Sequence, residues 1–208
     1  MVNSEKKIAL MIMAAGESKR FGSCKQLTSI NKEHTLLSHA AEQALSAQIG
    51  PVFIITGRWH NEIEQAQQHG ILGATTLLYY PNWSNGLGSS IAYGTKILAL
   101  KYDAILITLA DQIALADTDY QVFADYVDSE HIVCSNYSGK RGVPALFPAC
   151  YFSQLAQLSG EHGARSLLRE EQYPLLEVRL PHAEYDIDTP EALDRWKKDS
   201  RILSPPLK

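Results

Sequence analysis

Short apolar segments alternate with longer stretches of helical periodicity along almost the whole chain, and this alternation most constrains the fold. Two of the segments, Ile8–Ala14 and Ala104–Leu109, carry apolar side chains at nearly every position. A strand is apolar at consecutive positions when helices cover both faces of its sheet. The sequence therefore predicts an α/β fold of the Rossmann-like kind, with three layers and a mostly parallel central sheet.

The remaining segments predict the other elements of this fold. Further strands are expected at residues 51–56, 75–80, 131–134, 144–147 and 175–180. Helices are expected at residues 35–48, 61–69, 89–100, 118–127, 164–170 and 189–198. Thr189 is suited to cap the last of these helices and Pro190 to its first turn. Residues 199–208, with two prolines, are expected to form a tail.

Composition excludes several classes of protein. The 208 residues include 19 basic and 23 acidic side chains, so the net charge of −4 gives no general attraction to nucleic acid. Three widely spaced cysteines predict neither a disulfide framework nor a zinc site. No apolar run approaches the roughly 20 residues that span a membrane. We expect a cytoplasmic protein, although Lys6 and Lys7 before an apolar run are also found in secretory signals.

The loop after the first strand carries the strongest chemical signal. Ala14, Ala15 and Gly16 leave the strand with almost no side chain, so a charged ligand can approach the backbone closely. Backbone N–H groups near Ser18 and Gly22 are expected to point at an anion. Three cations and one acid follow within a short span: Glu17, Lys19, Arg20 and Lys25. We expect a solvated polyphosphate-binding loop; a basic surface loop without a ligand is the alternative.

Three known loop types do not fit this segment. Five residues separate Gly16 from Gly22, so the loop is not a Walker loop. The dinucleotide fingerprint that begins at Gly86 has Ile91 where its third glycine belongs. A hydrolase elbow at Ser18 would need glycine in place of Arg20, and nothing supplies a convincing His–Asp pair.

The motifs resemble those of a known family. The run A-A-G-E-S-K-R-F-G-S-C-K-Q-L resembles the signature A-A-G-x-S-x-R-x-G-x-x-K-x-L of nucleotidyltransferases with the GT-A-like fold. Among them the chain is similar to the molybdenum cofactor cytidylyltransferases. The likeness continues through N-W-S-N-G-L-G-S-S, L-A-D-Q, G-V-P-A-L-F, G-E-H-G-A-R-S-L-L and D-I-D-T-P-E. Ile113 replaces the family's usual proline, and Glu161 replaces its usual aspartate.

Carboxylates at two places suit a magnesium ion. Asp111 follows an apolar strand, so its carboxylate is expected at the ligand edge of the sheet, where the resemblance implies a Mg²⁺ contact. Asp186 and Asp188 share one face of an extended segment, and the resemblance implies a second contact there. Asp188 is favoured over Asp186. The alternatives are helix-capping roles for Asp111 and Asp188.

Two further segments complete the expected site. Asn85, Gly86 and Ser90 come at the start of a predicted helix and are assigned to the nucleotide, an ordinary capping loop being the alternative. The resemblance assigns Gly142, His162 and Arg165 to the acceptor. Cys24 lies beside Lys25, whose charge would favour a lowered thiol pKa; we nevertheless expect Cys24 to take no part in the chemistry.

The resemblance implies an enzyme that moves a CMP group from CTP to the phosphate of a molybdopterin-type cofactor, with Mg²⁺ and release of pyrophosphate. Arg20, Lys25 and Asp111 are the expected catalytic residues, and a molybdoenzyme is the expected recipient of the product. Residues 1–198 would form one domain, with a nucleotide-binding part to residue 115 and an acceptor-binding part after it. The alternatives are a nucleotidyltransferase for a sugar or polyol phosphate, and a non-catalytic cofactor-binding chaperone.

Overall fold

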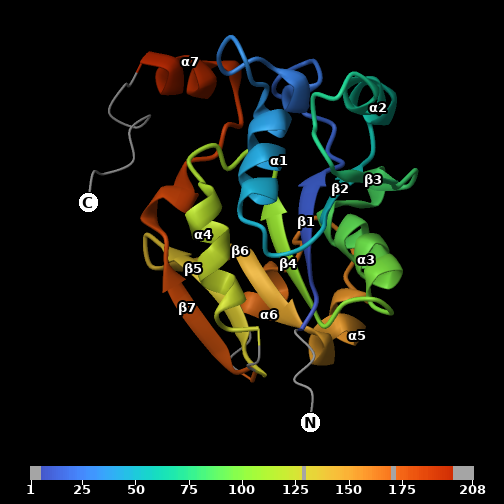
Figure 1. Ribbon diagram of the computed structural model, residues 1–208, viewed down its shortest axis with the longest axis vertical. Coiled ribbons are helices and arrows are strands. Elements are labelled where there is room, and N and C mark those ends of the chain that lie inside the picture. Colours follow the sequence, from blue (N-terminus) through green and yellow to red (C-terminus); the bar gives the residue numbers. More distant parts are fainter. Residues whose placement is uncertain (1–5, 128–129, 170–171, 199–208) are drawn as a thin grey trace.

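The computed structural model describes residues 6–127, 130–169 and 172–198. Within these ranges a seven-stranded sheet has the order β3-β2-β1-β4-β6-β5-β7 (Figure 1). Four strand pairings are parallel, and those of β6 with β4 and β5 are antiparallel. The strands are β1 (Ile8–Ala14), β2 (Val52–Thr56), β3 (Thr76–Tyr79), β4 (Ala104–Leu109), β5 (Ile132–Tyr137), β6 (Lys140–Pro148) and β7 (Leu175–Arg179). The predicted mostly parallel sheet is confirmed.

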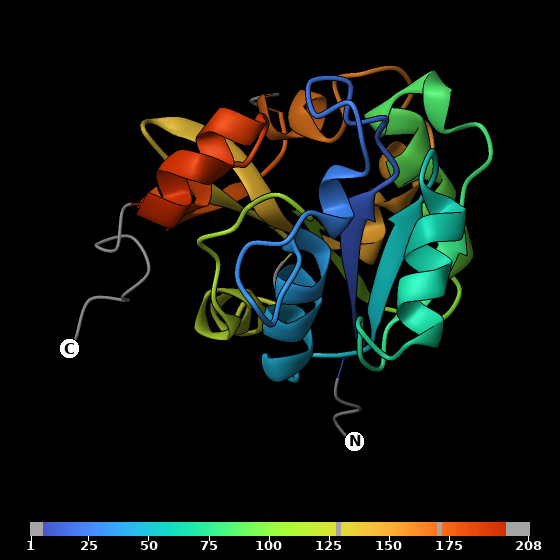
Figure 2. The same ribbon diagram turned by 90° about the horizontal axis from the view of Figure 1, so that it is seen from above.

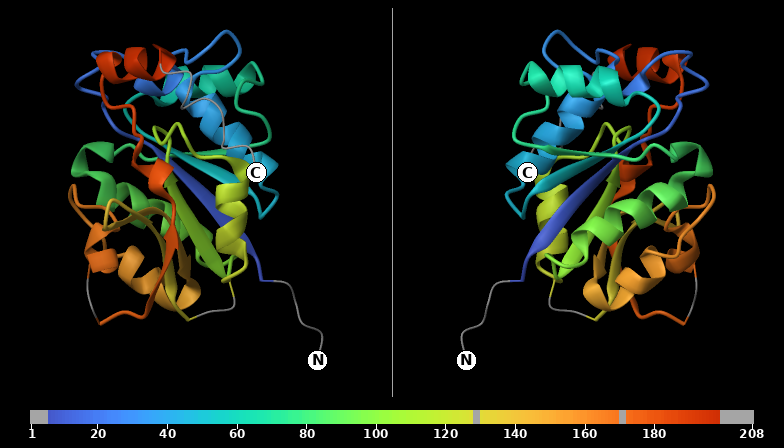
Figure 3. Two further views of the ribbon diagram at one scale, coloured as in Figure 1. Left: turned by 90° about the vertical axis from the view of Figure 1, so that its left-hand side faces the viewer. Right: turned by 90° about the vertical axis from the view of Figure 1, so that its right-hand side faces the viewer.

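Helices cover both faces of the sheet (Figure 3). On one face, apolar side chains of α1 (Leu36–Ser46), α2 (His60–Gln68) and α4 (Asp117–Ala124) join one core cluster. On the other, those of α3 (Leu87–Leu98), α5 (Phe152–Leu155) and α6 (Arg165–Arg169) join a second. β1 shows why its sequence is apolar throughout: Leu10 and Ile12 enter the first cluster, whereas Met11 and Met13 enter the second.

The antiparallel part of the sheet departs from the sequence-based expectation. β4 lies in the middle of the sheet, but it pairs in parallel with β1 and runs antiparallel to β6. β5 and β6 form a hairpin and are longer than the predicted segments 131–134 and 144–147. The prediction was too short because this end of the hairpin carries exposed polar side chains such as Lys140 and Arg141.

Several helix boundaries also differ from the prediction. α3 begins at Leu87 rather than at residue 89 and ends at Leu98, before the almost fully exposed Leu100. α4 is shorter than the predicted 118–127, and the short α5 was not predicted. The predicted tail lies outside the described residues, which contain no helix long and apolar enough to cross a membrane.

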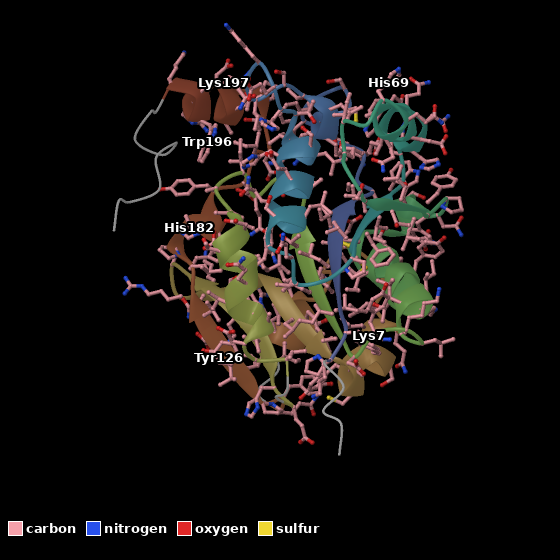
Figure 4. All side chains as sticks on the ribbon, in the orientation of Figure 1. Lys7, His69, Tyr126, His182, Trp196 and Lys197 are labelled. Carbon is pink, nitrogen blue, oxygen red and sulfur yellow. The ribbon has the colours of Figure 1, made fainter. Side chains whose placement is uncertain are left out.

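The last described segment returns to the carboxyl end of the sheet. The 3-10 helix η4 (Pro181–Glu184) follows β7, and α7 (Pro190–Lys198) then lies at the same end of the molecule as the loop that follows β1 (Figures 1 and 2). The backbone N–H of Ala192 donates to Thr189 Oγ1 at 3.2 Å, so the predicted cap is confirmed. Leu193 and Trp196 of α7 pack with Leu36 at the start of α1. Figure 4 shows the position of Trp196 on α7.

Candidate functional site

A cleft of about 660 Å³ lies beyond the carboxyl ends of β1 and β4. Its walls come from the end of β1 with the loop that follows, from the start of α3, and from the end of β4. The predicted residues that line it are Ala14, Ala15, Gly16, Ser18, Arg20, Lys25, Gly86, Ser90, Asp111 and Asp188. The fold therefore brings together residues from four separate segments of the chain, as expected for a ligand site of an open α/β sheet.

The loop after β1 is tight because Ser18 and Gly22 both have positive φ, of 59° and 67°. The N–H groups of Phe21 and Gly22 donate to the Ser18 carbonyl at 2.9 and 3.2 Å. The N–H of Gly22 is thus used inside the loop and does not point at an anion, contrary to the expectation. Gly16, in contrast, has no atom within 4 Å of the position a Cβ would take, so its backbone is open toward the cleft.

Two residues that the sequence analysis missed hold this loop in place. Gln26 is buried; its amide donates to the Ala14 carbonyl at 3.2 Å, and its Oε1 accepts from Ser18 Oγ at 3.2 Å. The indole of Trp59 donates to the Glu17 carbonyl at 3.0 Å. A glutamine directly after Lys25 was an available signal for such a support, because a buried amide requires hydrogen-bond partners.

Opposite charges meet on the floor of the cleft. Lys25 Nζ lies 2.7 Å from Asp111 Oδ2 and 3.2 Å from Asp188 Oδ1, and Arg20 Nη2 lies 2.9 Å from Asp188 Oδ2. The Lys25 side chain is only 13% exposed, so the expectation of a solvated side chain is wrong for it; Arg20, at 66%, meets the expectation. Lys25 turns inward because the two carboxylates attract its charge more strongly than burial disfavours it.

The pKa values follow from this arrangement. Burial disfavours the charge of Lys25, but Asp111 and Asp188 outweigh it, so the pKa of Lys25 is raised. Burial likewise disfavours the charge of Asp188, but Lys25 and Arg20 outweigh it and lower its pKa. Burial and the neighbouring carboxylates raise the pKa of Asp186, which does not line the cleft. Of the two neighbouring aspartates, Asp186 and Asp188, Asp188 is thus the more readily ionised.

The carboxylate oxygens of the cleft fit a divalent cation that is also coordinated by the phosphates of a bound ligand. Among the described residues, Asp111 Oδ1 is a buried oxygen without a hydrogen-bond partner. No group of three or more His, Cys, Asp or Glu side chains in the described ranges forms a metal-binding cluster. Mg²⁺ commonly takes one or two carboxylates and completes its coordination with water and substrate phosphates. Asp111 and Asp188 match that pattern.

The start of α3 forms another wall of the cleft. Gly86 has φ of 96°, and a Cβ there would collide with the Gly160 backbone, so the loop before α3 packs directly on residues 159–161. Ser90 is 2% exposed, and its hydroxyl donates to the Gly86 carbonyl at 3.3 Å. Asn85 is not among the lining residues, whereas Glu161, from the segment facing Gly86, is one of them.

The structure does not place the residues assigned to the acceptor in the lining of this cleft, although His162 directly follows the lining residue Glu161. Gly142, His162 and Arg165 are not among its lining residues. Gly142 is covered by the Tyr137 ring, whose hydroxyl a Cβ would strike, and the Arg165 charge acts on the same tyrosine. Cys24 is a spectator by its chemistry, because burial raises its thiol pKa to about 11 instead of lowering it.

Comparisons with known proteins agree with this geometry. Residues 10–176 match the family model of the MobA-like NTP transferase domain. Purine catabolism protein PucB of Bacillus subtilis is 29% identical over 196 residues, which cover 90% of this chain and 95% of that protein. Nicotine blue oxidoreductase of Paenarthrobacter nicotinovorans is 27% identical, covering 89% of this chain and 94% of that protein.

A solved structure supports the fold. The Rv0371c protein of Mycobacterium tuberculosis aligns with a TM-score of 0.80 and 23% identity, over 93% of this chain and 99% of that one. Its complex with manganese aligns with a TM-score of 0.77 and 22% identity, over the same shares of both chains. With the family model matched over most of its length, the chain belongs to the family of proteins with the MobA-like NTP transferase domain and is a nucleotidyltransferase.

Proposed function

We propose that this nucleotidyltransferase transfers a CMP group from CTP to the phosphate of a molybdopterin-type cofactor and releases pyrophosphate. The observation that carries the nucleotidyl-transfer part is the meeting of Lys25, Asp111 and Asp188 beside the open backbone of Gly16. The acceptor is proposed from the resemblance of residues 142–147 and 160–168 to the cytidylyltransferases. In this proposal residues 1–115 bind the nucleotide, residues 116–198 complete the acceptor site, and the reaction takes place in the cytoplasm.

The proposed roles of the side chains follow from their charges. Asp111 and Asp188 would hold Mg²⁺, which when bound neutralises phosphate charge and polarises the α-phosphate. Arg20 and Lys25 would turn from these carboxylates to the pyrophosphate as it departs. The acceptor phosphate is already an anion, so no side chain is needed to remove a proton from it. The chain contributes alignment and charge neutralisation.

The preference for CTP is proposed from Ala15, which is 6% exposed and lines the cleft. Its methyl group narrows the space above the loop, where related guanylyltransferases usually have glycine, and a pyrimidine needs less room than a purine. We expect CTP to be used first, UTP second and purines last. Competition at equal nucleotide concentrations measures this order, and Ala15→Gly should increase the use of GTP relative to CTP. Equal use of GTP and CTP by the unsubstituted protein would contradict the steric argument.

The proposal is tested by pyrophosphate release from each of four nucleoside triphosphates with a panel of phosphorylated acceptors. Release with CTP and molybdopterin supports it. Release only with a sugar or polyol phosphate would reassign the acceptor, and binding of molybdopterin without any release would indicate a chaperone. Detection of CMP-linked product separates transfer from simple hydrolysis of CTP.

Asp111→Asn is the decisive variant in this assay. It should fold normally and lose most turnover, because it removes charge from the proposed metal site and loosens the pair with Lys25. Asp103→Asn is the matched control. This aspartate lies directly before β4, at the end of the strand remote from Asp111, and its carboxylate accepts a hydrogen bond from the Lys7 N–H at 2.8 Å. Near-normal turnover of Asp111→Asn would contradict the metal assignment.

A further inference from the structure

Gln112 follows Asp111 at the end of β4, and its side chain is not part of the cleft lining. The residue is only 5% exposed. A primary amide carries two donor hydrogens and an acceptor oxygen, and burying them without partners costs free energy. The partners of this amide therefore indicate why a polar side chain occupies this position.

The amide of Gln112 joins three segments of the chain. Its Nε2 donates to the carbonyls of Val143 in β6 and Ala183 in η4, at 2.8 and 2.9 Å. Its Oε1 accepts from Thr108 Oγ1 and from the Leu109 N–H in β4, at 3.3 and 3.4 Å. Both donor hydrogens and the oxygen are thus engaged, which fixes the side chain.

The bond to η4 acts close to the carboxylates of the cleft, because the chain passes from Ala183 to Asp186 and Asp188 within a few residues. The backbone makes the same connection: the N–H of Ile187 donates to the Asp111 carbonyl at 3.0 Å. Gln112 and Asp186 also form an isolated antiparallel bridge. The returning segment therefore rests on the end of β4 through the backbone, through apolar packing of Ile187 with Ile113, and through the hydrogen bonds of the Gln112 amide.

We propose that Gln112 is a positioning residue that sets the spacing between the Asp111 and Asp188 carboxylates for a metal–nucleotide complex. The inference rests on the proposed function, in which these carboxylates bind the metal. Groups that hold metal ligands in place, without touching the metal, change metal affinity by about 10- to 100-fold when they are replaced. A glutamine that only filled the core would affect folding stability and leave the metal dependence unchanged.

The experiment uses whichever of the four nucleoside triphosphates binds best. Its dissociation constant is measured once with EDTA and once with saturating Mn²⁺. The ratio of the two constants measures how strongly the metal tightens nucleotide binding. Gln112→Met keeps the side-chain length and removes all four hydrogen bonds. We expect it to reduce the ratio by about tenfold. Ser135→Ala is the matched control, because it removes a buried hydrogen bond of 2.8 Å to the carbonyl of Pro144, a bond that does not involve η4.

The outcomes separate the possible failures. A reduced ratio for Gln112→Met with a normal ratio for Ser135→Ala supports the proposal, and an unchanged ratio for Gln112→Met overturns it. If Gln112→Met does not fold, Thr108→Val decides in the same way, since it removes one of the four bonds and keeps the side-chain volume. Asp111→Asn is the reference: if it keeps the full ratio, the metal assignment of the proposed function fails, and the positioning role fails with it.

Discussion

At the residue scale, replacing Lys25 is expected to affect both the stability of the fold and the chemistry of the cleft. Lys25→Ala leaves Asp111 and Asp188 facing each other without their shared cation, so we expect a loss of about 2 kcal/mol in the free energy of unfolding. The value of kcat/KM for the nucleotide should fall as well. Lys19→Ala is the control, because that side chain is 81% exposed and forms an ion pair with Glu17 on the surface. Equal urea-denaturation curves for both variants would contradict the role of Lys25.

Replacing glycine with alanine is expected to have different effects at Gly16 and at Gly88. A Cβ on Gly16 meets no atom within 4 Å, so Gly16→Ala should fold normally, with the KM for the nucleotide raised about tenfold by the methyl group in the cleft. A Cβ on Gly88 would lie 2.7 Å from the Ser159 carbonyl oxygen, so Gly88→Ala should lose about 2 kcal/mol of stability. Thermal melts and nucleotide titrations of the two variants check both statements. A destabilised Gly16→Ala would show that the loop after β1 has no spare room.

At the scale of elements, η4 is tied to α4 by an ion pair that depends on pH. His182 Nε2 lies 2.7 Å from Asp119 Oδ2, and Figure 4 shows His182 beside α4. The hydrogen bond to Asp119 raises the pKa of His182 despite partial burial. Its contribution to stability is therefore complete below the ordinary imidazole pKa of about 6.5 and is lost as the pH rises through the raised value.

His182→Gln measures this contribution. The loss of stability relative to the unsubstituted protein should be larger at pH 6 than at pH 9, by urea denaturation at both pH values. His39→Gln is the control with the opposite sign, because burial lowers the pKa of His39 despite its contact with the Ile113 carbonyl. The unsubstituted protein should lose stability from His39 as the pH falls. The same pH trend in both variants would contradict this assignment.

At the scale of the whole molecule, α7 packs the end of the described chain onto the start of α1 and onto the segment after β4. Trp196 is 7% exposed and packs in one cluster with Leu36 of α1, Ile113 after β4, and Ile187 between the two aspartates. Trp196→Ala should cost about 3 kcal/mol of stability and reduce turnover, because Ile187 loses a packing partner. Lys197→Ala, exposed on the same helix, should change neither. A stable and fully active Trp196→Ala would show that α7 does not support the cleft.

The fold class and the loop after β1 could be predicted because both depend on local patterns of the sequence. Apolar residues at consecutive positions of β1 identify a strand covered on both sides, and the small residues from Ala14 to Gly16 mark a close approach to the backbone. Such local patterns do not predict the order and direction of the strands in the sheet. That β6 runs antiparallel to β4 depends on contacts between distant segments, which the local period of the sequence does not encode.

The candidate site divides in the same way. The sequence by itself determined which charged residues to examine: Lys25 in the loop after the first strand, Asp111 at the end of a strand, and Asp188 beside the start of a helix. Only the tertiary structure decided that they touch, across separations of 86 and 163 residues, and that Lys25 is buried instead of solvated. The support from Gln26, Trp59 and Gln112 also appeared only there. The physical reason is that hydrogen bonds and charge pairs depend on distance in space, which is set by how the strands stack, whereas helical and strand periodicity depends only on neighbours along the chain.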